Sequence, residues 1–377
     1  MRKRIPRRLS SPIKEGTSRR GFLERVAGAG VSCLAFSGLG PEAVALAARK
    51  REQGNDGPRF KTRGVILKPS DITNWPWVEK AKRAGLTTIG THFSPDEVEE
   101  FFATDKGVAF QEECRAAGIA IEHELHSMKH LLPRELFEKD PAMFRMDENG
   151  QRRNDWNLCV HSAAALEVVC ENAVKYAGIL KSDTGRYFYW MDDGKPMCSC
   201  PRCKDLSTSD QALLLNNAMA KSLRAYDPRA KLAHLSYHGT LPAPTQVVPD
   251  ANVFLEFAPI ERDYKAPFGT SSREKTWLEH LDSNLKLFGA EDAQVLEYWL
   301  DESMFYRQGR RKGRKGMVPI PWDREVFDAD LDIYGKRGIR HVTTFAIMVH
   351  QGYVDKFGEP PLMAYGQGLK KWRPKKP

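Results

Sequence analysis

The sequence predicts an α/β protein whose main part is one (β/α)8 barrel, also called a TIM barrel, and two observations lead to this fold class. Eight short segments rich in β-branched and aromatic residues alternate with longer amphipathic segments. Alternating strands and helices form parallel βαβ units, and eight such units close a barrel in ~250 residues or somewhat more. An open doubly wound sheet is the alternative, but no glycine-rich phosphate-binding turn follows the first predicted strand.

Each predicted strand is short and ends in a polar loop or in a loop that contains glycine or proline. The eight strands are expected at residues 63–68, 86–91, 119–126, 186–192, 231–237, 253–258, 294–300 and 340–347.

The predicted helices show one apolar face. In the segment 272–288, Trp277, Leu281 and Leu285 recur at every fourth position and therefore lie on the same side of a helix. The other helices are expected at residues 97–117, 163–180, 212–226 and 323–338. Glycines mark three expected helix ends, at Gly85, Gly118 and Gly289.

The connection after the fifth predicted strand differs from the others. Residues 239–250 contain three prolines and no helical period. We therefore expect one barrel helix to be reduced at this point.

The basic charge of the chain is concentrated at its N-terminus. The formal net charge is +9, and the first 50 residues hold 11 basic and 3 acidic residues. The rest of the chain therefore holds 47 basic and 46 acidic residues, a net charge of +1. Because the excess of positive charge does not extend over the barrel, we expect no nucleic-acid partner.

The N-terminal residues have the pattern of a cleaved targeting signal. Arg19 and Arg20 precede an apolar stretch, 26–48, whose single charged residue is Glu42. Ala45-Leu46-Ala47 provides the small residues that a signal peptidase accepts. This segment resembles a twin-arginine (Tat) export signal, which implies the Tat translocase as a partner during export. A basic tail that precedes a core helix is the alternative.

These features divide the chain into a Tat signal peptide at 1–48, a polar linker at 49–60 and the barrel at 61–377. No other stretch approaches the ~20 apolar residues of a membrane span. We therefore expect a periplasmic or extracellular protein without a stable membrane span.

Three cysteines lie close together in the motif Cys198-x-Cys200-x-x-Cys203. Clustered thiolates suit Zn²⁺, which takes four ligands in structural sites, and Cys159 or His161 would supply the fourth. A disulfide with one free thiol is the competing interpretation. A structural zinc ion is thus the one expected cofactor, with no organic cofactor.

Carboxylates lie near the ends of the fourth and seventh predicted strands. Asp192 and Asp193 follow a run of aromatic residues, and Glu297 and Asp301 lie on or just after the seventh strand. Catalytic groups of such barrels gather at the C-terminal ends of the strands. Cleavage of a glycosidic bond requires two carboxyl groups that flank the bond. We therefore predict Asp193, Asp192 and Glu297 as catalytic candidates, with Asp301 as the alternative to Glu297; structural capping or ion pairing is the other interpretation of each.

Other polar and aromatic residues near strand ends are candidates for substrate binding. Alternate positions put Glu122, Glu124 and His126 on one side of the third strand. The predicted substrate-binding residues are His92, His126, His130, Tyr237, Glu256, Tyr298 and Trp299. Trp299, Phe305, Tyr306 and Trp322 are candidates for platforms on which sugar rings stack, although each fits a core position as well. The basic run 307–315 is either a solvated loop or a source of attraction for an anionic glycan.

The combination of several motifs resembles one bacterial family. The motifs are His126-x-x-x-His130-x-x-Pro133, Pro141-x-x-Phe144 followed by Gly150-x-Arg152, Leu158-Cys159, and Asp192-Asp193-Gly194 before the cysteine motif. Over residues 118–348 the sequence is similar to the domain of unknown function 4838, whose members look like glycoside-hydrolase-type barrels. The resemblance implies a polysaccharide or oligosaccharide substrate.

The sequence departs from this family at one position, since Asp192 stands where members usually have Asn. An Asp-Asp pair is similar to that of hexosaminidases that use the acetamido group of the substrate as nucleophile. In that case Asp192 would orient the acetamide and Asp193 would be the general acid.

Three functions compete at this point. The first is a glycoside hydrolase that acts on a complex polysaccharide with N-acetylated or acidic sugars. The second is a non-catalytic carbohydrate-binding barrel. The third is a metal-dependent hydrolase that uses His92, His126 and a carboxylate.

Overall fold

The computed structural model describes residues 60–313 and 315–374, and in them eight parallel strands form a closed barrel in sequence order. Pairing of β1 with β8 closes the barrel, with Val65 opposite Thr344. The strands are β1 (Thr62–Leu67), β2 (Thr88–Thr91), β3 (Ala120–His126), β4 (Arg186–Trp190), β5 (Lys231–Ser236), β6 (Val253–Phe257), β7 (Gln294–Glu297) and β8 (His341–Phe345). The predicted fold class and all eight predicted strands are confirmed.

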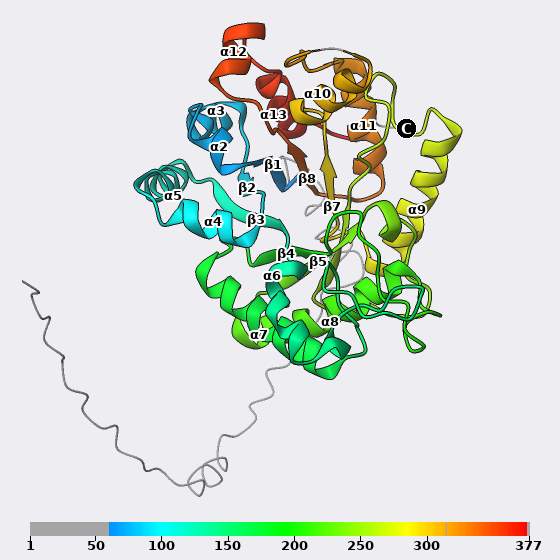
Figure 1. Ribbon diagram of the computed structural model, residues 1–377. Helices are drawn as coiled ribbons and strands as arrows, with labels where there is room; N and C mark the ends of the chain where they lie inside the picture. The colour runs from blue at the N-terminus through cyan, green and yellow to red at the C-terminus, as the bar shows by residue number, and fades with distance from the viewer. Residues whose placement is uncertain (1–59, 314, 375–377) are drawn as a thin grey trace, which may run out of the picture. The chain divides into compact units, whose positions relative to one another are not determined.

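The helices surround the strands as an outer ring (Figure 1). They are α2 (Pro69–Ile72), α3 (Trp77–Ala84), α4 (Pro95–Phe102), α5 (Asp105–Ala117), α6 (Met128–Leu131), α7 (Ala163–Ile179), α8 (Thr208–Tyr226), α9 (Ser272–Phe288), α10 (Glu302–Arg311), α11 (Arg324–Lys336), α12 (Gln351–Phe357) and α13 (Leu362–Lys371). The short 3-10 turns are η1 (Arg134–Glu138), η2 (Pro141–Met143) and η3 (His238–Thr240).

Local sequence explains where the helices begin and end. α9 begins at a capping box, in which the Ser271 side chain accepts a hydrogen bond from the Glu274 N–H and Glu274 bonds back to Ser271. α3 and α5 end at Gly85 and Gly118, whose φ angles of 80° and 70° favour glycine.

The predicted helix 97–117 is two helices in the structure. Thr104 interrupts it, because its hydroxyl accepts a hydrogen bond from the Gly107 N–H and so starts α5 anew. A side chain at Gly107 would meet the backbone of Phe101, so the turn between the two helices packs tightly.

Between β5 and β6, η3 is the only helical turn, which confirms the expected reduction of one barrel helix. A longer connection between α6 and α7 carries η1, η2 and two isolated bridges, Phe144 with Leu158 and Met146 with Arg152.

Alternate side chains of the strands point into the barrel and fill it. Gln294 of β7 donates hydrogen bonds to Glu124 at 3.1 Å and Glu256 at 3.0 Å, so all three lie in the same interior layer. Gly90 completes this packing, because a side chain there would meet Ile66 and approach Glu124. The barrel is thus closed below its C-terminal end, and only the uppermost inward residues can contact a ligand.

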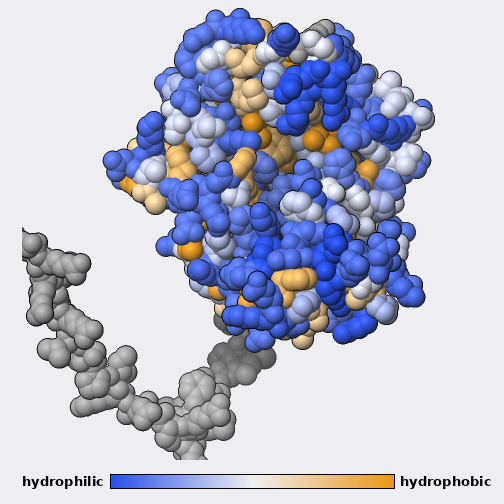
Figure 2. All heavy atoms as spheres, in the orientation of Figure 1, coloured by the Kyte–Doolittle hydropathy of each residue, from blue (hydrophilic) through white to orange (hydrophobic). Residues whose placement is uncertain are grey.

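The surface is largely hydrophilic on the face shown, with small apolar patches between polar residues (Figure 2). Among the described residues, no helix combines the length and apolar character that crossing a membrane requires. The predicted Tat signal at 1–48 and the linker, except Phe60, lie outside the described residues.

Candidate active site

A cleft with two adjoining lobes opens at the C-terminal ends of the strands. Lobe 1 has a volume of about 560 Å³ and lies over β4, β5 and the first turns of α8. Lobe 2 has a volume of about 810 Å³ and lies over the mouth of the barrel. Both lobes are lined by His126, Trp190, Asp193, Leu235, Tyr237 and His238. These shared residues mark the junction of the lobes, where one extended ligand would pass from one lobe to the other.

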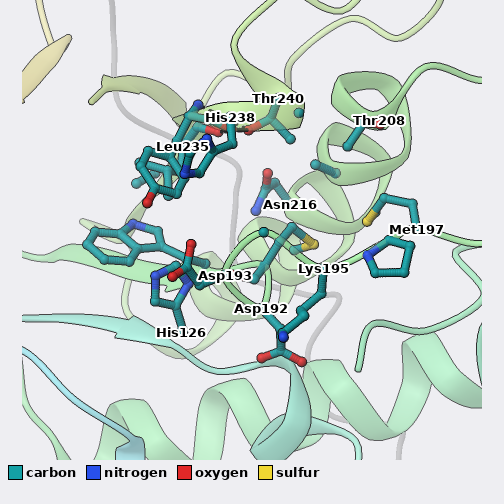
Figure 3. Close-up of a pocket in the computed structure, with 18 residues that line it drawn as sticks. His126, Asp192, Asp193, Lys195, Met197, Thr208, Asn216, Leu235, His238 and Thr240 are labelled. Atoms are coloured by element: carbon teal, nitrogen blue, oxygen red, sulfur yellow. Dashed lines mark hydrogen bonds between the residues drawn. The ribbon is translucent and has the colours of Figure 1, made fainter. Parts of the chain in front are cut away.

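Asp193 lies at this junction, directly after β4. Its side chain is exposed to the cleft and is drawn beside His126 in Figure 3. Tyr237, from the end of β5, lines both lobes together with Asp193. Burial and the charge of Asp193 raise the pKa of the Tyr237 phenol, so the hydroxyl keeps its proton and can donate a hydrogen bond to a ligand.

Asp192 points away from Asp193, as Figure 3 shows. It is 8% exposed, and its Oδ1 accepts a hydrogen bond of 3.3 Å from the Lys129 N–H. Burial raises the pKa of Asp192, opposed by that hydrogen bond and by His126 and Arg134. The second carboxylate oxygen, Oδ2, is buried without a hydrogen-bond partner. The two adjacent carboxyls therefore have different surroundings.

The backbone around Asp193 is held by one buried amide. Asn157 Oδ1 accepts a hydrogen bond of 3.2 Å from the Asp192 N–H. Its Nδ2 donates to the carbonyls of Lys195 and Pro196, both at 3.2 Å. Asn157 is fully buried and bonds to the chain on both sides of Asp193. These three hydrogen bonds, the Asn157 clamp, fix the turn that carries the Asp193 carboxyl group.

Two imidazoles form part of the floor of the cleft. The Nδ1 of His92 donates to the Glu124 carbonyl at 2.7 Å, and the Nδ1 of His126 donates to the Met191 carbonyl at 2.6 Å. Because carbonyl oxygens only accept, each Nδ1 carries a proton. Burial, with the nearby His126, lowers the pKa of His92 to about 3, so this ring is neutral and its Nε2 can accept a hydrogen bond from a ligand hydroxyl.

The end of β7 contributes Tyr298 and Asp301 to lobe 2. Asp301 is 2% exposed and is the N-cap of α10, where its Oδ1 accepts hydrogen bonds from Ser303 and Met304. Burial raises the pKa of Asp301, opposed by the Ser303 hydrogen bond and by Arg307. Asp193 and Asp301 are therefore two carboxyls of one lobe, one exposed and one desolvated.

Glu297 does not face the cleft, which corrects the expectation that it opposes Asp193. Its neighbours Leu296 and Tyr298 point inward, so Glu297 points outward from the barrel. There it accepts hydrogen bonds from Arg262 at 2.9 Å, from Tyr264 at 3.0 Å and from Tyr334. This buried network holds α11 against the barrel, and it leaves Asp301 as the carboxyl near the end of β7 that lines the cleft.

Three further candidates also lie away from the cleft lining. Glu256 is fully buried in the barrel interior, where its Oε2 accepts a hydrogen bond of 2.7 Å from the Trp190 indole. Trp299 is in the core behind the sheet, with its indole N–H 3.1 Å from Asp330. His130 pairs with Asp96 at 3.0 Å on the outer surface. Of the predicted binding residues, His92, His126, Tyr237 and Tyr298 do line the cleft.

The predicted stacking platforms Phe305 and Trp322 do not line either lobe, and neither does Tyr306. The aromatic residue under the junction is Trp190 of β4, whose ring centroid lies 5.1 Å from that of His126. Its inward alternation in β4 is the signal that could have identified it.

His238 is a second cleft residue outside the predicted set. It lines both lobes and has a φ of 46°, in the left-handed region that non-glycine residues rarely adopt. Backbone strain of this kind concentrates at ligand-binding sites. The spacing of residues in the sequence reveals neither this strained backbone nor the hydrogen bonds of Asn157.

A separate group of four buried cysteines adjoins the same turn. The Sγ atoms of Cys159, Cys198, Cys200 and Cys203 all lie within 4.8 Å of one another, and none of the four forms a disulfide. The Cys159 Sγ is 3.7 Å from that of Cys200 and 3.9 Å from that of Cys203. Four thiolates at 2.3 Å from a central ion lie about 3.8 Å apart at tetrahedral geometry. The cluster can therefore hold a metal ion, with Cys159 as the fourth member of the group.

Donors around the cluster suit bound thiolates. The Met146 N–H lies 3.3 Å from the Cys198 Sγ, and the Arg152 guanidinium approaches the same sulfur at 3.8 Å. His161 Nδ1 is 3.2 Å from the Cys203 Sγ, which places His161 beside the cluster as a hydrogen-bond partner. In the described residues this is the only group of three or more His, Cys, Asp or Glu side chains arranged to hold a metal. His92 and His126 do not form such a group.

The structure thus defines a (β/α)8 barrel with a carboxyl-lined cleft at the C-terminal ends of its strands and a four-cysteine cluster beside it. Residues 41–299 match the family described as Domain of unknown function (DUF4838), and the chain belongs to that family. No curated protein sequence matches the chain.

Several solved structures are similar to the chain. One is a glycoside hydrolase family 5 enzyme from Prevotella bryantii B14 in complex with a xyloglucan tetradecasaccharide, with 10% identity, 83% of this chain and 99% of that chain covered, and a TM-score of 0.48. Another is the catalytic domain of beta-amylase from Paenibacillus polymyxa, with 12% identity, 83% and 99% covered, and a TM-score of 0.49.

Proposed function

We propose that this protein is a glycoside hydrolase that acts on a complex polysaccharide or on oligosaccharides derived from it. The observation that carries the proposal is the position of Asp193 at the junction of two lobes, with Asp301 in the same lobe. A chain of sugars that fills both lobes places a glycosidic bond beside Asp193. Glycosidic cleavage requires two carboxyls on either side of such a bond.

In this proposal Asp193 is the general acid, which gives a proton to the oxygen of the leaving sugar. Asp301 is the second carboxyl and acts on the anomeric carbon, either directly or through a water molecule. The hydrogen bonds from Ser303 and Met304 and the charge of Arg307 favour the carboxylate form of Asp301 that this role requires, and they oppose the effect of burial. Trp190 is the platform under the sugar at the junction, and His92, Tyr237 and Tyr298 bind hydroxyl groups.

The substrate-assisted alternative requires Asp192 to orient an acetamido group. The Asp192 side chain points away from Asp193 (Figure 3), whereas Asp301 and Asp193 line the same lobe, and this difference favours Asp301 as the second carboxyl. N-acetylated and acidic sugars both remain in the proposed substrate class. A non-catalytic carbohydrate-binding barrel is the second candidate function, favoured by the hydrogen bonds that engage Asp301 as a helix cap.

We further propose that the four-cysteine cluster holds a structural Zn²⁺ ion. A closed set of four thiolates is typical of structural zinc and leaves no ligand position for a substrate. The ion would join the segment of Asn157 and Cys159 to the loop 198–203 and so support the turn that carries Asp193. For the N-terminal segment we propose Tat-dependent export to the periplasm or the exterior, with the metal acquired before export.

Glycan release tests the proposed hydrolase. The chain from about residue 51 is incubated with N-acetylated, uronic, sulfated and neutral polysaccharides, and new reducing ends are measured. Asp193→Asn is compared with Asp205→Asn, a matched change of an exposed residue on the same connection that lines neither lobe. Release that is lost only in Asp193→Asn supports the proposal. Equal release by both variants removes Asp193 from the reaction, and binding without any release identifies the non-catalytic function.

A further inference from the structure

We propose that lobe 2 contains a binding site for an anionic group of the substrate, a carboxylate or a sulfate, formed by Lys68, Arg307 and Arg311. This inference rests on the proposed function, because it names the substrate class of the same cleft. All three side chains line lobe 2. Lys68 follows β1, and the two arginines are one turn apart on α10, so separate elements bring their charges to one cavity.

None of these three cations forms an ion pair with the residues that the structure describes. The Lys68 Nζ lies over the Phe93 ring at 4.4 Å, and Arg307 Nη1 donates to the Ser303 hydroxyl at 3.2 Å. Arg273, the fourth cation of the lobe, differs because it pairs with Glu261. Most of the donors of Lys68, Arg307 and Arg311 are therefore available to a ligand.

The position of Arg307 is close to the reacting groups. Its charge opposes the rise in pKa that burial causes at both Tyr237 and Asp301, which follow two different strands around the lobe. A guanidinium presents its N–H groups in a planar fork that matches a carboxylate or sulfate in a bidentate manner. An anionic group bound here would hold a sugar ring in lobe 2 beside the Asp193 and Asp301 carboxyls.

The two lobes differ in charge, which gives the site a direction. Lobe 1 is lined by Lys195, Asp192 and Asp193, so its cations do not outnumber its anions. Lobe 2 is lined by four cations and three carboxyls. One cation and one carboxyl, Arg273 and Glu261, pair with each other, so three cations and two carboxyls remain. Charges that line a cavity with apolar walls attract ligands of the opposite sign strongly. The anionic sugar therefore occupies lobe 2 and a neutral sugar occupies lobe 1.

Calorimetric titration of the Asp193→Asn protein tests this site without turnover. The probes are tetragalacturonate, a chondroitin sulfate tetrasaccharide and neutral cellotetraose. We expect at least one anionic probe to bind roughly tenfold more tightly than cellotetraose. Whichever of the two binds identifies a carboxylate or a sulfate as the recognised group. Raising the salt from about 0.05 M to about 0.5 M should weaken the anionic probe only.

Arg307→Ala and Arg311→Ala are each expected to weaken the anionic probe roughly tenfold and to leave cellotetraose unchanged. Arg310→Ala is the matched control, since this arginine lies on the same helix, near the Tyr306 ring, and lines neither lobe. Equal binding of neutral and anionic probes, or no effect of either substitution, overturns the inference. If the protein binds the anionic probe but hydrolyses no glycan, this site stands and the proposed hydrolase is overturned. If the protein hydrolyses only neutral glycans, the hydrolase stands and this site is overturned.

Discussion

Replacement of Asn157 by alanine tests whether the buried clamp positions the candidate acid. The substitution removes three hydrogen bonds of 3.2 Å, one from the Asp192 N–H and two to the carbonyls of Lys195 and Pro196. Each bond contributes about 1 kcal/mol, and leaving the buried Asp192 N–H without an acceptor costs about 1–3 kcal/mol. We therefore expect the free energy of unfolding to fall by about 3 kcal/mol.

The substitution should also slow catalysis. The turn loses its attachment on both sides of Asp193, and a displacement of about 1 Å at a reacting group can reduce the rate about 100-fold. We expect kcat to fall by about this factor on the best glycan of the release panel, with KM changed less than about threefold. Urea unfolding and steady-state kinetics below the transition measure the two quantities separately.

Asn172→Ala is the matched control for this experiment. Asn172 donates one hydrogen bond, to the Leu131 carbonyl at 2.9 Å, and lies outside the cleft lining. It should lose about 1 kcal/mol of stability and keep its kcat. A destabilised Asn157→Ala protein with an unchanged kcat would refute the positioning role, because the clamp would then contribute to folding alone.

Three further predictions concern the cysteines, Tyr237 and Glu256. Cys159→Ser should reduce bound zinc from about one ion per chain to less than half of that and should lower the melting temperature. Cys170→Ser, outside the cluster, should change neither quantity. Elemental analysis that finds no metal in the unsubstituted protein contradicts the site. Tyr237→Phe removes the hydroxyl that interacts with the charge of Asp193, so kcat should fall roughly tenfold and the pH–rate profile should shift, with little change in unfolding; an unaltered profile argues against that interaction. Burial raises the pKa of Glu256 to about 8, so between pH 4.5 and 8 the folded protein retains a proton that the unfolded chain releases, and stability falls as pH rises through this window. Glu256→Gln cannot ionise and should show a slope shallower by up to about 1.4 kcal/mol per pH unit in urea unfolding; identical slopes exclude Glu256 as the source.

The strands could be predicted because each is a short apolar run between turn residues, and because closure of the barrel depends on their number and parallel direction. The reduced helix after β5 was also visible, since three prolines interrupt any helical period there. The break between α4 and α5 was not predicted, because it depends on a hydrogen bond of Thr104 and on the close approach of Gly107 to Phe101.

The site could be predicted in part. Strand ends directed attention to His92, His126, Asp193 and Tyr237, which all line the cleft, because side chains at the C-terminal ends of parallel strands converge on one mouth. Glu297 was misplaced because its direction depends on the exact register of β7, in which Gln294 faces inward and a residue three positions later faces outward. Its partner Arg262 comes from a different connection, and sequence periodicity does not reveal such a pair.

The proposed transfer of a proton from Asp193 to the leaving sugar is tested most directly by the dependence of variant activity on the leaving group. Asp193→Asn and Asp301→Asn are assayed on the best natural oligosaccharide and on an aryl glycoside of the same sugar whose phenol needs no protonation to leave. We expect Asp193→Asn to lose activity on the oligosaccharide but to keep most of its activity on the aryl glycoside, whereas Asp301→Asn should lose both. Equal losses on the two substrates for Asp193→Asn, or retention of the aryl glycoside by Asp301→Asn alone, would contradict the proposed proton transfer.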